Sequence, residues 1–367
     1  MVLFPTSRRE ITDRVNGIDP MAYSRDRNFL NGHVTKLSPY ISRGVITTAQ
    51  ILNSLKERGY SWQQCEKLVQ ELCWRDYFQR IWQSIGTGVD KDIKNVQSDV
   101  RHHEVPKAIA DARTGIDAID LGIQELLDTG YMHNHLRMYV ASITCNVGRS
   151  HWRQPAHWMY YHLLDADWAS NACSWQWVSG AFSSKKYFAN QENINKYCNS
   201  KQRNTFLDVE YDAFDNPPFP DGLHALTTPK TPCILPPSDT LTPISGKKVL
   251  IYNWYNLDPD WQAGEDVGRI LLLEPSVFSK YPVSNRSIGF MLALARNIEG
   301  IQIFTGEFDA LRKTLPNVSF VYKEHPLNQY EGKEEARDFI SDYMFNGQPG
   351  FFSYWKKLER QLSHAWS

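Results

Sequence analysis

Apolar residues recur every three or four positions from the start of the chain to about Phe206, which is the spacing of one face of an α-helix. The pattern predicts helices over residues 47–59, 65–86 and 118–130. Each of these segments ends at a glycine, a residue that commonly terminates helices. We therefore expect residues 1–206 to form an all-α domain.

The helical periodicity is lost between residues 207 and 245, a stretch that holds eight of the 19 prolines. Such a segment is typical of a linker or an extended crossover. Beyond it, a predicted helix at 284–298 alternates with short apolar runs at 247–254, 268–275, 301–306 and 318–326. This alternation predicts a small α/β domain over residues 246–367, with a parallel sheet flanked by helices, so the expected fold class is α plus α/β.

Composition sets few limits on function. The formal net charge is -1, so a nucleic-acid partner would be held by a local basic patch rather than by a global positive field. The six cysteines show no C-x-x-C pair, which favours reduced thiols and no metal site. No apolar run approaches the roughly 18 to 20 residues that a membrane span needs. We expect a cytoplasmic protein without a membrane partner.

Two predicted helices each align polar and apolar groups on one face: Glu71, Trp74, Arg75 and Phe78 on one, and Asn134, Arg137 and Met138 on the other. Taken alone, the first face also fits a core helix with an internal ion pair, and the second fits a polar stripe at a helix interface. The stretch DADWASNACSWQW, residues 165–177, adds two carboxylates and three tryptophans. No GxGxxG or P-loop opens a helix of the α/β half.

Five segments, in this order and at this spacing, resemble the cryptochrome/DNA photolyase family. The resemblance runs from Tyr23 to Tyr187. Its segments are YSRDRNFLNGHVTKLSPYISRGVIT, QELCWRDYF, TGIDAIDLGIQELLDTGYMHNHLRM, HWRQ and DADWASNACSWQWVSG. Any one of them alone would be a weak signal, whereas five in order are specific.

The resemblance implies an FAD cofactor. In the family, the residue matching Asp167 reaches the adenosine ribose and the flavin, and the residue matching Asp165 pairs with the arginine that matches Arg137. Asn171 matches the residue facing flavin N5, where an amide can hydrogen-bond the flavin without readily losing a proton to it. The other residues expected to bind FAD are Tyr23, Thr35, Lys36, Leu37, Ser38, Arg75 and Asn134. At Val34 the chain departs from a usual threonine of the phosphate-binding loop.

The resemblance also implies an electron-transfer chain and a lesion pocket. Trp175 matches the flavin-proximal tryptophan and Trp152 the middle one. No third tryptophan matches, so we expect Trp158, Tyr160 or Tyr161 to end the chain. The pocket of enzymes that split cyclobutane pyrimidine dimers is matched by Glu71, Trp74, Asn134, Met138 and Trp177. A flipped dimer needs an aromatic wall, polar groups for its edges and a carboxyl group that stabilises a radical anion.

DNA contacts are expected from Arg27, Glu71, Trp74, His135, Lys185 and Lys186. His135 stands where dimer photolyases usually carry an arginine beside the DNA backbone, and Ala189 stands near a second such position. Each lost phosphate contact lowers affinity and flattens its salt dependence. The nearby cations Lys196, Lys201 and Arg203 either compensate or form an ordinary solvated face.

The α/β half resembles the family's antenna domain, which normally precedes the FAD domain. The matching segments are residues 251–262, 270–298, 301–311 and 346–362. We expect a circular permutation of the family architecture rather than an unrelated appended domain. The sequence does not define an antenna pigment or an oligomeric state.

Two functions follow from these expectations. The first is a light-driven photolyase that splits cyclobutane pyrimidine dimers in damaged DNA with an electron from reduced FAD. The alternative is a cryptochrome-like blue-light photoreceptor that binds FAD without repair activity. The pocket residues favour the enzyme, and the two missing arginines favour the receptor.

Overall fold

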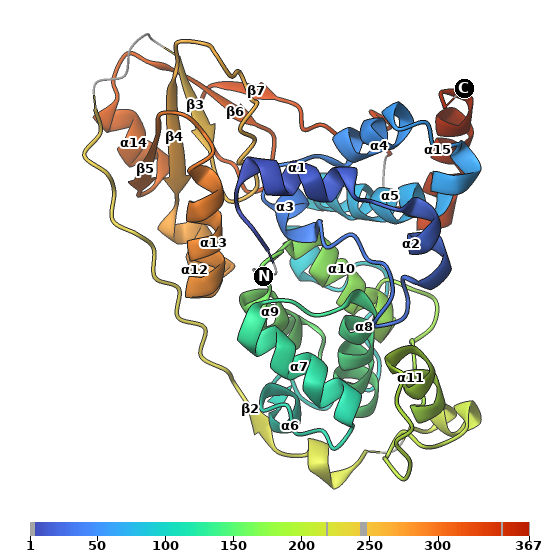
Figure 1. Cartoon of the computed structure of the whole chain (residues 1–367). Coiled ribbons are helices and arrows are strands. Elements are labelled where there is room, and N and C mark those ends of the chain that lie inside the picture. Colours follow the sequence, from blue (N-terminus) through green and yellow to red (C-terminus); the bar gives the residue numbers. More distant parts are fainter. Residues whose placement is uncertain (1–3, 218, 243–247, 346–347, 367) are drawn as a thin grey trace. The chain divides into compact units, whose positions relative to one another are not determined.

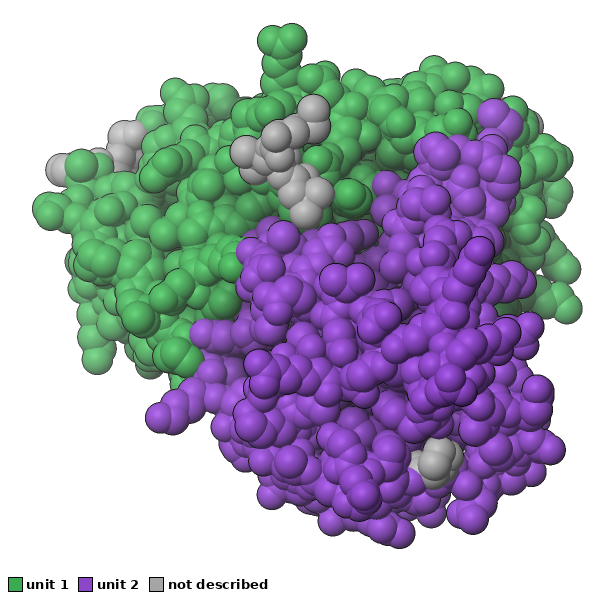
Figure 2. Space-filling view, turned by 60° about the horizontal axis from the view of Figure 1, so that its bottom comes forward, with its two compact units in different colours: residues 1–20, 35–86, 232–367 green, residues 21–34, 87–231 purple. Residues whose placement is uncertain are grey.

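The computed structural model describes residues 4–217, 219–242, 248–345 and 348–366. The start of the first predicted strand, at Lys247, lies outside them, as do parts of the predicted linker and of the last antenna-like segment. The chain divides into two compact units, which Figure 2 colours separately. Unit 1 holds residues 1–20, 35–86 and 232–367, and unit 2 holds residues 21–34 and 87–231.

The helices of unit 1 come from both ends of the sequence (Figure 1). They are α1 (Arg8–Asn16), α3 (Ser38–Ser42), α4 (Thr48–Glu57), α5 (Trp62–Ile85), α12 (Pro275–Lys280), α13 (Asn285–Ala295), α14 (Phe308–Thr314) and α15 (Phe351–His364). A capping box starts α4, where the Thr47 hydroxyl accepts from the Gln50 N–H and the Gln50 side chain accepts from the Thr47 N–H. Gly86, with φ at 52°, follows the last residue of α5. The helices predicted at 47–59, 65–86 and 284–298 are confirmed.

A five-stranded parallel sheet forms the α/β part of unit 1. Its strands are β3 (Lys248–Tyr252), β4 (Gly268–Leu273), β5 (Ile301–Thr305), β6 (Ser319–Lys323) and β7 (Lys333–Glu335). Their spatial order is β5-β4-β3-β6-β7, and every neighbouring pair is parallel. Counted within the sheet, this is the order 3-2-1-4-5 of doubly wound folds. The predicted fold class, α plus α/β, is confirmed, and β7 was missed because Lys-Glu-Glu carries no apolar pattern.

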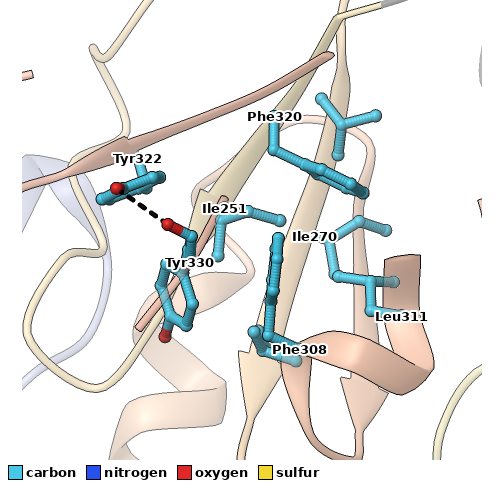
Figure 3. Close-up of a cluster of buried hydrophobic side chains, with 9 residues drawn as sticks. Ile251, Ile270, Phe308, Leu311, Phe320, Tyr322 and Tyr330 are labelled. Carbon is cyan, nitrogen blue, oxygen red and sulfur yellow. Dashed lines mark hydrogen bonds between the residues drawn. The ribbon is translucent and has the colours of Figure 1, made fainter. Parts of the chain in front are cut away.

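Both faces of the central strands of the sheet are buried. Alternate residues point to one face, where they meet Phe308 and Leu311 of α14 (Figure 3): Val249, Ile251, Ile270, Leu272, Phe320 and Tyr322. The intervening residues Leu250, Leu271 and Leu273 are also fully buried. Burial on both faces explains why the strands read as continuous apolar runs in the sequence.

The segment before β3 covers the edge strand β5. The Asp239 N–H donates to the Ile303 carbonyl at 2.9 Å, and the Thr305 N–H donates to the Ser238 hydroxyl at 2.9 Å. A covered edge has fewer unpaired backbone groups to offer to another chain. Residues 238 and 239 of the Pro-rich stretch are therefore hydrogen-bonded to the sheet.

Polar contacts join α5 to the chain that follows β7. The buried carboxylate of Asp76 accepts from the Thr48 hydroxyl at 2.8 Å and from the Ile340 N–H at 2.8 Å. The Arg337 guanidinium donates to Gln79 at 2.7 Å, and Arg80 donates to the Ser341 carbonyl at 3.0 Å. The C-terminal helix α15 then packs on α5, where Trp355 stacks on Trp62.

Unit 2 is built from helices and short turns. Its helices are α2 (Pro20–Asp26), which starts at the boundary of the unit, α6 (Lys107–Ala110), α7 (Asp117–Thr129), α8 (Asn134–Ser142), α9 (Arg153–His162), α10 (Trp168–Ser179) and α11 (Gln191–Cys198). A 3-10 turn, η1, spans Gly86–Asp90, and a π-helical turn, η2 (Ile143–Val147), follows α8. Gly130, with φ at 76°, follows α7, so the helix predicted at 118–130 is confirmed.

The Pro-rich stretch is partly ordered into local structure. Its described part holds the 3-10 turns η3 (Tyr211–Asp215) and η4 (Asp221–Leu223). It also holds β2 (Leu226–Thr227), which pairs antiparallel with β1 (Val105–Pro106). Among the described residues, no helix combines the length and the apolar character that crossing a membrane requires.

Candidate functional site

An ion pair lies at the start of α8 in unit 2. Arg137 donates from Nη1 to Oδ2 of Asp165 at 2.9 Å and from Nε to the Met132 carbonyl at 2.9 Å. Asp165 sits in the short loop between α9 and α10 and is 6% exposed. A carboxylate is retained at such depth because a cation and hydrogen bonds offset its lost hydration. The pairing of these two residues is thus observed, and their contact with FAD stays a prediction.

Asp167 has a local structural role. It is the N-cap of α10, and its side chain accepts from the Ser170 N–H at 3.1 Å. This contact satisfies one of the free N–H groups at the helix start and places a negative charge at the positive end of the helix dipole. The cap therefore fixes the start of α10 two residues after Asp165, the acidic partner of Arg137.

Asn171 lies one turn into α10 and is buried. Its side-chain amide donates to the Ala156 carbonyl of α9 at 2.8 Å. An asparagine side chain carries two N–H donors and one carbonyl acceptor, so this bond orients the amide without exhausting it. The contact holds the side chain that is expected to face flavin N5.

The predicted phosphate-binding residues belong mostly to unit 1. Lys36 has φ at 51°, a left-handed conformation that turns the chain just before α3. Thr35, Lys36 and Ser38 are half-buried, whereas Leu37 is buried. Arg75 donates to the Ser42 hydroxyl at 2.6 Å, and Ser42 donates to the Ser38 carbonyl at 2.7 Å.

Tyr23 lies on α2, in unit 2. It is half-buried, and the Arg27 guanidinium lies over its ring at 5.8 Å from the centroid. The residues expected to bind FAD are therefore distributed over both units.

The chemistry of these residues fits FAD. Thr35, Lys36 and Ser38 offer hydroxyl and ammonium donors of the kind that phosphates accept. The loop before α10 offers buried carboxylate and amide groups that can bind ribose hydroxyls and a flavin edge. The Ser170 hydroxyl is also buried there and has no hydrogen-bond partner within the described part of the chain. Buried polar groups of this kind are normally satisfied, which is consistent with a polar ligand.

The tryptophans predicted to carry electrons are deep in unit 2. Trp152 and Trp175 are 0% and 2% exposed. Trp168 is also fully buried, and its ring centroid lies 6.4 Å from that of Trp152. Sequence reasoning gave Trp168 no role, although it precedes Trp175 by seven residues, the spacing of two helical turns.

The three candidates for the end of the chain differ in exposure. Trp158 and Tyr160 are 3% and 1% exposed, whereas Tyr161 is half-buried. Tyr160 meets Trp168 edge to face, with centroids 5.5 Å apart. The terminal member of the chain stays a prediction.

The predicted pocket residues fall into two groups. In unit 2, Asn134 and Trp177 are exposed and Met138 is half-buried, on the helices α8 and α10 that pack together. In unit 1, Glu71 is half-buried and lies 3.2 Å from the Lys67 ammonium. Each of these side chains is at least partly exposed, as a contact with a ligand requires. Their joint role in one pocket stays a prediction.

Trp74 lies in a different environment from the open wall that the sequence predicts. Its indole is stacked on the Phe351 ring of α15, with centroids 3.5 Å apart and planes inclined by 12°. Phe352 meets the same indole edge to face at 6.2 Å. One face of the indole is therefore taken by the protein itself.

The residues predicted to bind DNA also differ among themselves. Burial, helped by the charge of Arg27, lowers the pKa of His135 to about 4, so this side chain is neutral at pH 7 and supplies no charge to a phosphate. Lys186 is engaged with Asp99 at 2.7 Å, whereas Lys185 is exposed. Arg27 donates to the Ser24 carbonyl at 3.2 Å.

Comparison with known proteins gives matches to one part of the chain. Residues 68–208 match the family model described as the FAD binding domain of DNA photolyase. A deoxyribodipyrimidine photo-lyase of Streptomyces griseus is 30% identical over 182 residues, which are 47% of this chain and 38% of the relative. A cryptochrome DASH of Xenopus laevis is 32% identical over 173 residues, which are 43% of this chain and 32% of the relative. The chain thus spans well under half the length of these relatives.

Solved structures give similar matches. A bacterial class III photolyase from Agrobacterium tumefaciens has a TM-score of 0.46 at 26% identity, covering 52% of this chain and 41% of that one. A cryptochrome of Synechocystis has a TM-score of 0.48 at 24% identity, covering 53% of this chain and 44% of that one.

The matched segment, with its capped α10 and its buried ion pair, defines a helical flavin-binding domain with FAD as its cofactor. Through this segment the chain is similar to the photolyase and cryptochrome family. Its relatives include both repair photolyases and DASH cryptochromes, so the family alone leaves repair and photoreception open.

Proposed function

We propose that the protein is a light-driven DNA repair enzyme that splits cyclobutane pyrimidine dimers. FAD, when bound and reduced, supplies the electron that light drives into the lesion. The residues of the chain hold the cofactor, orient the dimer and keep water from the radical. The substrate is damaged DNA with a flipped dimer.

The observation that carries the proposal is the contrast between two neighbouring tryptophans of α10. Trp175 is 2% exposed, whereas Trp177, two residues on, exposes 36% of its surface. A large aromatic ring left open to solvent suits stacking on a flipped base, which contributes about 1–3 kcal/mol per base. The buried ring of Trp175 suits electron transfer to the flavin, so the two tryptophans support both photoreduction of the cofactor and binding of the lesion.

Glu71 is the candidate for stabilising the reacting dimer. Its carboxylate is partly exposed, with 30% of the side chain accessible, and it lies near the Lys67 ammonium. A carboxylate in this position can accept a hydrogen bond from a pyrimidine N–H. Asn134 and Met138 supply a polar and an apolar contact of the kind that the two edges of a dimer need.

The receptor function has support from two other observations. The stacked Phe351 occupies a face of Trp74, and His135 lacks the charge that a phosphate contact would use. Both features weaken DNA binding compared with an open pocket flanked by an arginine. A cryptochrome-like photoreceptor, which needs FAD but no lesion, would tolerate them.

We further propose that the α/β part is an antenna-type domain in permuted order. The parallel sheet with order β5-β4-β3-β6-β7 supports a nucleotide-binding type of domain rather than an arbitrary appendage. In this proposal, residues 1–206 are the helical domain, residues 207–245 the linker and residues 246–367 the antenna-type domain. The compact units follow contacts instead, and they join α1, α3, α4 and α5 to the sheet.

A binding experiment separates the two functions. The dissociation constants for an oligonucleotide with one thymine dimer and for the same undamaged oligonucleotide are measured in the dark. Repair predicts clearly tighter binding of the damaged strand, and a Trp177→Ala variant should lose most of that preference. Equal constants for both strands would favour the receptor.

A further inference from the structure

Trp168 is a fully buried aromatic residue that the expected mechanism leaves unused. It is 0% exposed and begins α10. Its ring lies 6.4 Å from Trp152, stacks on His157 at 4.0 Å and meets Tyr160 edge to face at 5.5 Å. An indole oxidises readily, and a ring contact of this kind is short enough for fast electron exchange with Trp152.

Each of these two indoles donates its N–H to a carboxylate. Trp168 Nε1 lies 2.8 Å from Asp90 Oδ1, and Trp152 Nε1 lies 2.7 Å from Asp92 Oδ1. Hydrogen bonds to an ionised acceptor are stronger than neutral ones, and they strengthen further when the donor becomes positive. A carboxylate at this position therefore lowers the cost of removing an electron from the indole.

The two carboxylates differ in their surroundings. Asp92 also accepts from the Gln97 N–H at 2.9 Å, lies 3.2 Å from His151 and is itself half-buried. The bond between Asp90 and Trp168 is buried at both ends. In a low-dielectric interior, a positive indole next to a carboxylate is neutralised most simply by moving one proton between them.

We propose that Trp168 is a further electron donor behind Trp152 and that Asp90 accepts its indole proton. This inference rests on the proposed function as a light-driven flavoprotein. FAD, when bound, would supply the light-driven oxidant, and Trp175 and Trp152 are the proposed relays between it and Trp168. Trp168 then gives one electron to oxidised Trp152, and its N–H proton moves to the Asp90 carboxylate. The products are a neutral indole radical and a neutral carboxylic acid, so charge and protons balance.

The proton transfer explains what Trp168 adds. An electron returning to the neutral radical must be accompanied by the proton from Asp90, so recombination is slower than for a bare indole cation. An added thiolate can instead donate the electron, and the proton then returns from Asp90 to the indole nitrogen. The pair thus holds the oxidising equivalent until an external thiolate returns an electron to the indole.

The test uses the FAD-loaded full chain and three variants. Trp168→Phe keeps an aromatic ring, and Asp90→Asn keeps an acceptor oxygen but not a base. Trp82→Phe is the matched control, because it removes another buried indole, on α5. Radicals formed by light are identified by electron paramagnetic resonance with ring-deuterated tryptophan. Wild type and control should show a long-lived deprotonated indole radical, and the other two variants should lose it.

A second readout needs no flavin. In flavin-free protein labelled with 15N-tryptophan, one indole N–H resonance should vanish in Trp168→Phe and should shift in Asp90→Asn. An unmoved resonance in Asp90→Asn, or an unchanged radical in Trp168→Phe, would overturn the inference. A wild type that binds no FAD would overturn the proposed function itself, whereas an FAD-loaded wild type without a light-induced radical, or radicals that the variants leave unaffected, would overturn only the role of Trp168.

Discussion

The indole of Trp74 and the phenyl ring of Phe351 are stacked face to face, with centroids 3.5 Å apart and planes inclined by 12°. Phe351 is 4% exposed and begins α15, whereas its neighbour Phe352 is 70% exposed. The C-terminal helix thus covers the aromatic surface that the sequence assigns to the lesion.

This stacking predicts competition between Phe351 and a flipped dimer. Phe351→Leu keeps an apolar side chain but removes the flat ring, so the affinity for dimer-containing DNA should rise relative to wild type. Trp74→Ala should lower that affinity by about 1–3 kcal/mol, the range for a base-stacking aromatic. Fluorescence anisotropy with a labelled oligonucleotide measures both.

Phe352→Leu is the control, because it changes an exposed ring next to the stacked one. It should leave the affinity for damaged DNA unchanged. If Phe351→Leu and Trp74→Ala leave it unchanged as well, Trp74 only packs against α15.

Asp167 can be tested without confusing cofactor loss with unfolding. Asparagine is as good an N-cap as aspartate, so Asp167→Asn should preserve the start of α10 while removing a charge from the flavin site. We expect this variant to keep the thermal stability of the flavin-free protein and to bind FAD more weakly. Asp167→Ala should lose both, with about 0.5–2 kcal/mol of stability lost through the cap. Flavin retention equal to wild type in Asp167→Asn would contradict the cofactor role.

His135 predicts a change in the salt dependence of DNA binding. Because its pKa is lowered to about 4, the side chain is neutral at pH 7. His135→Arg should add one phosphate contact and steepen the slope of log K against log salt by roughly 0.9. His135→Gln, which stays neutral, should leave the slope as it is. Identical slopes in all three proteins would show that this position does not face the DNA backbone.

Asp76 predicts a pH dependence of stability. Burial raises its pKa from 3.8 to about 6, although the Ile340 N–H, the Thr48 hydroxyl and nearby arginines pull the other way. The folded state therefore holds this proton more tightly than the unfolded chain. Its contribution to stability is full below pH 3.8 and is lost as pH rises to about 6, by about 3 kcal/mol for a shift of two pKa units.

Urea denaturation at several pH values checks this sign. Asp76→Asn carries no titrating proton, so the free energy of unfolding of wild type minus that of the variant should fall between pH 4 and pH 6. A difference that is flat or rises with pH would contradict the assignment.

Local periodicity accounts for the parts of the fold that the sequence predicted. Burial of a whole face produces the apolar spacing in α4, α5, α7 and α13 and the continuous apolar runs in β3 to β6. These elements could therefore be predicted without knowledge of tertiary contacts. β7 could not be predicted, because its three residues are all polar and show no apolar pattern.

Long-range contacts account for what the sequence missed. The stack of Phe351 on Trp74, and the bond from Ile340 to Asp76, join residues more than 260 positions apart. Nothing in either local pattern specifies its partner. The contact of Trp168 with Asp90 was likewise hidden, because Asp90 lies in a short 3-10 turn without apolar periodicity.

The central claim is light-driven repair, and one measurement tests it most directly. The protein, loaded with FAD and chemically reduced without oxygen, is mixed with an oligonucleotide that holds a single thymine dimer and is exposed to blue light. The account predicts that thymine absorbance is restored in the light and not in the dark, and that Trp175→Phe repairs equally well because the flavin is already reduced. A protein that binds FAD and photoreduces normally, yet restores no thymine absorbance under illumination, would contradict the account.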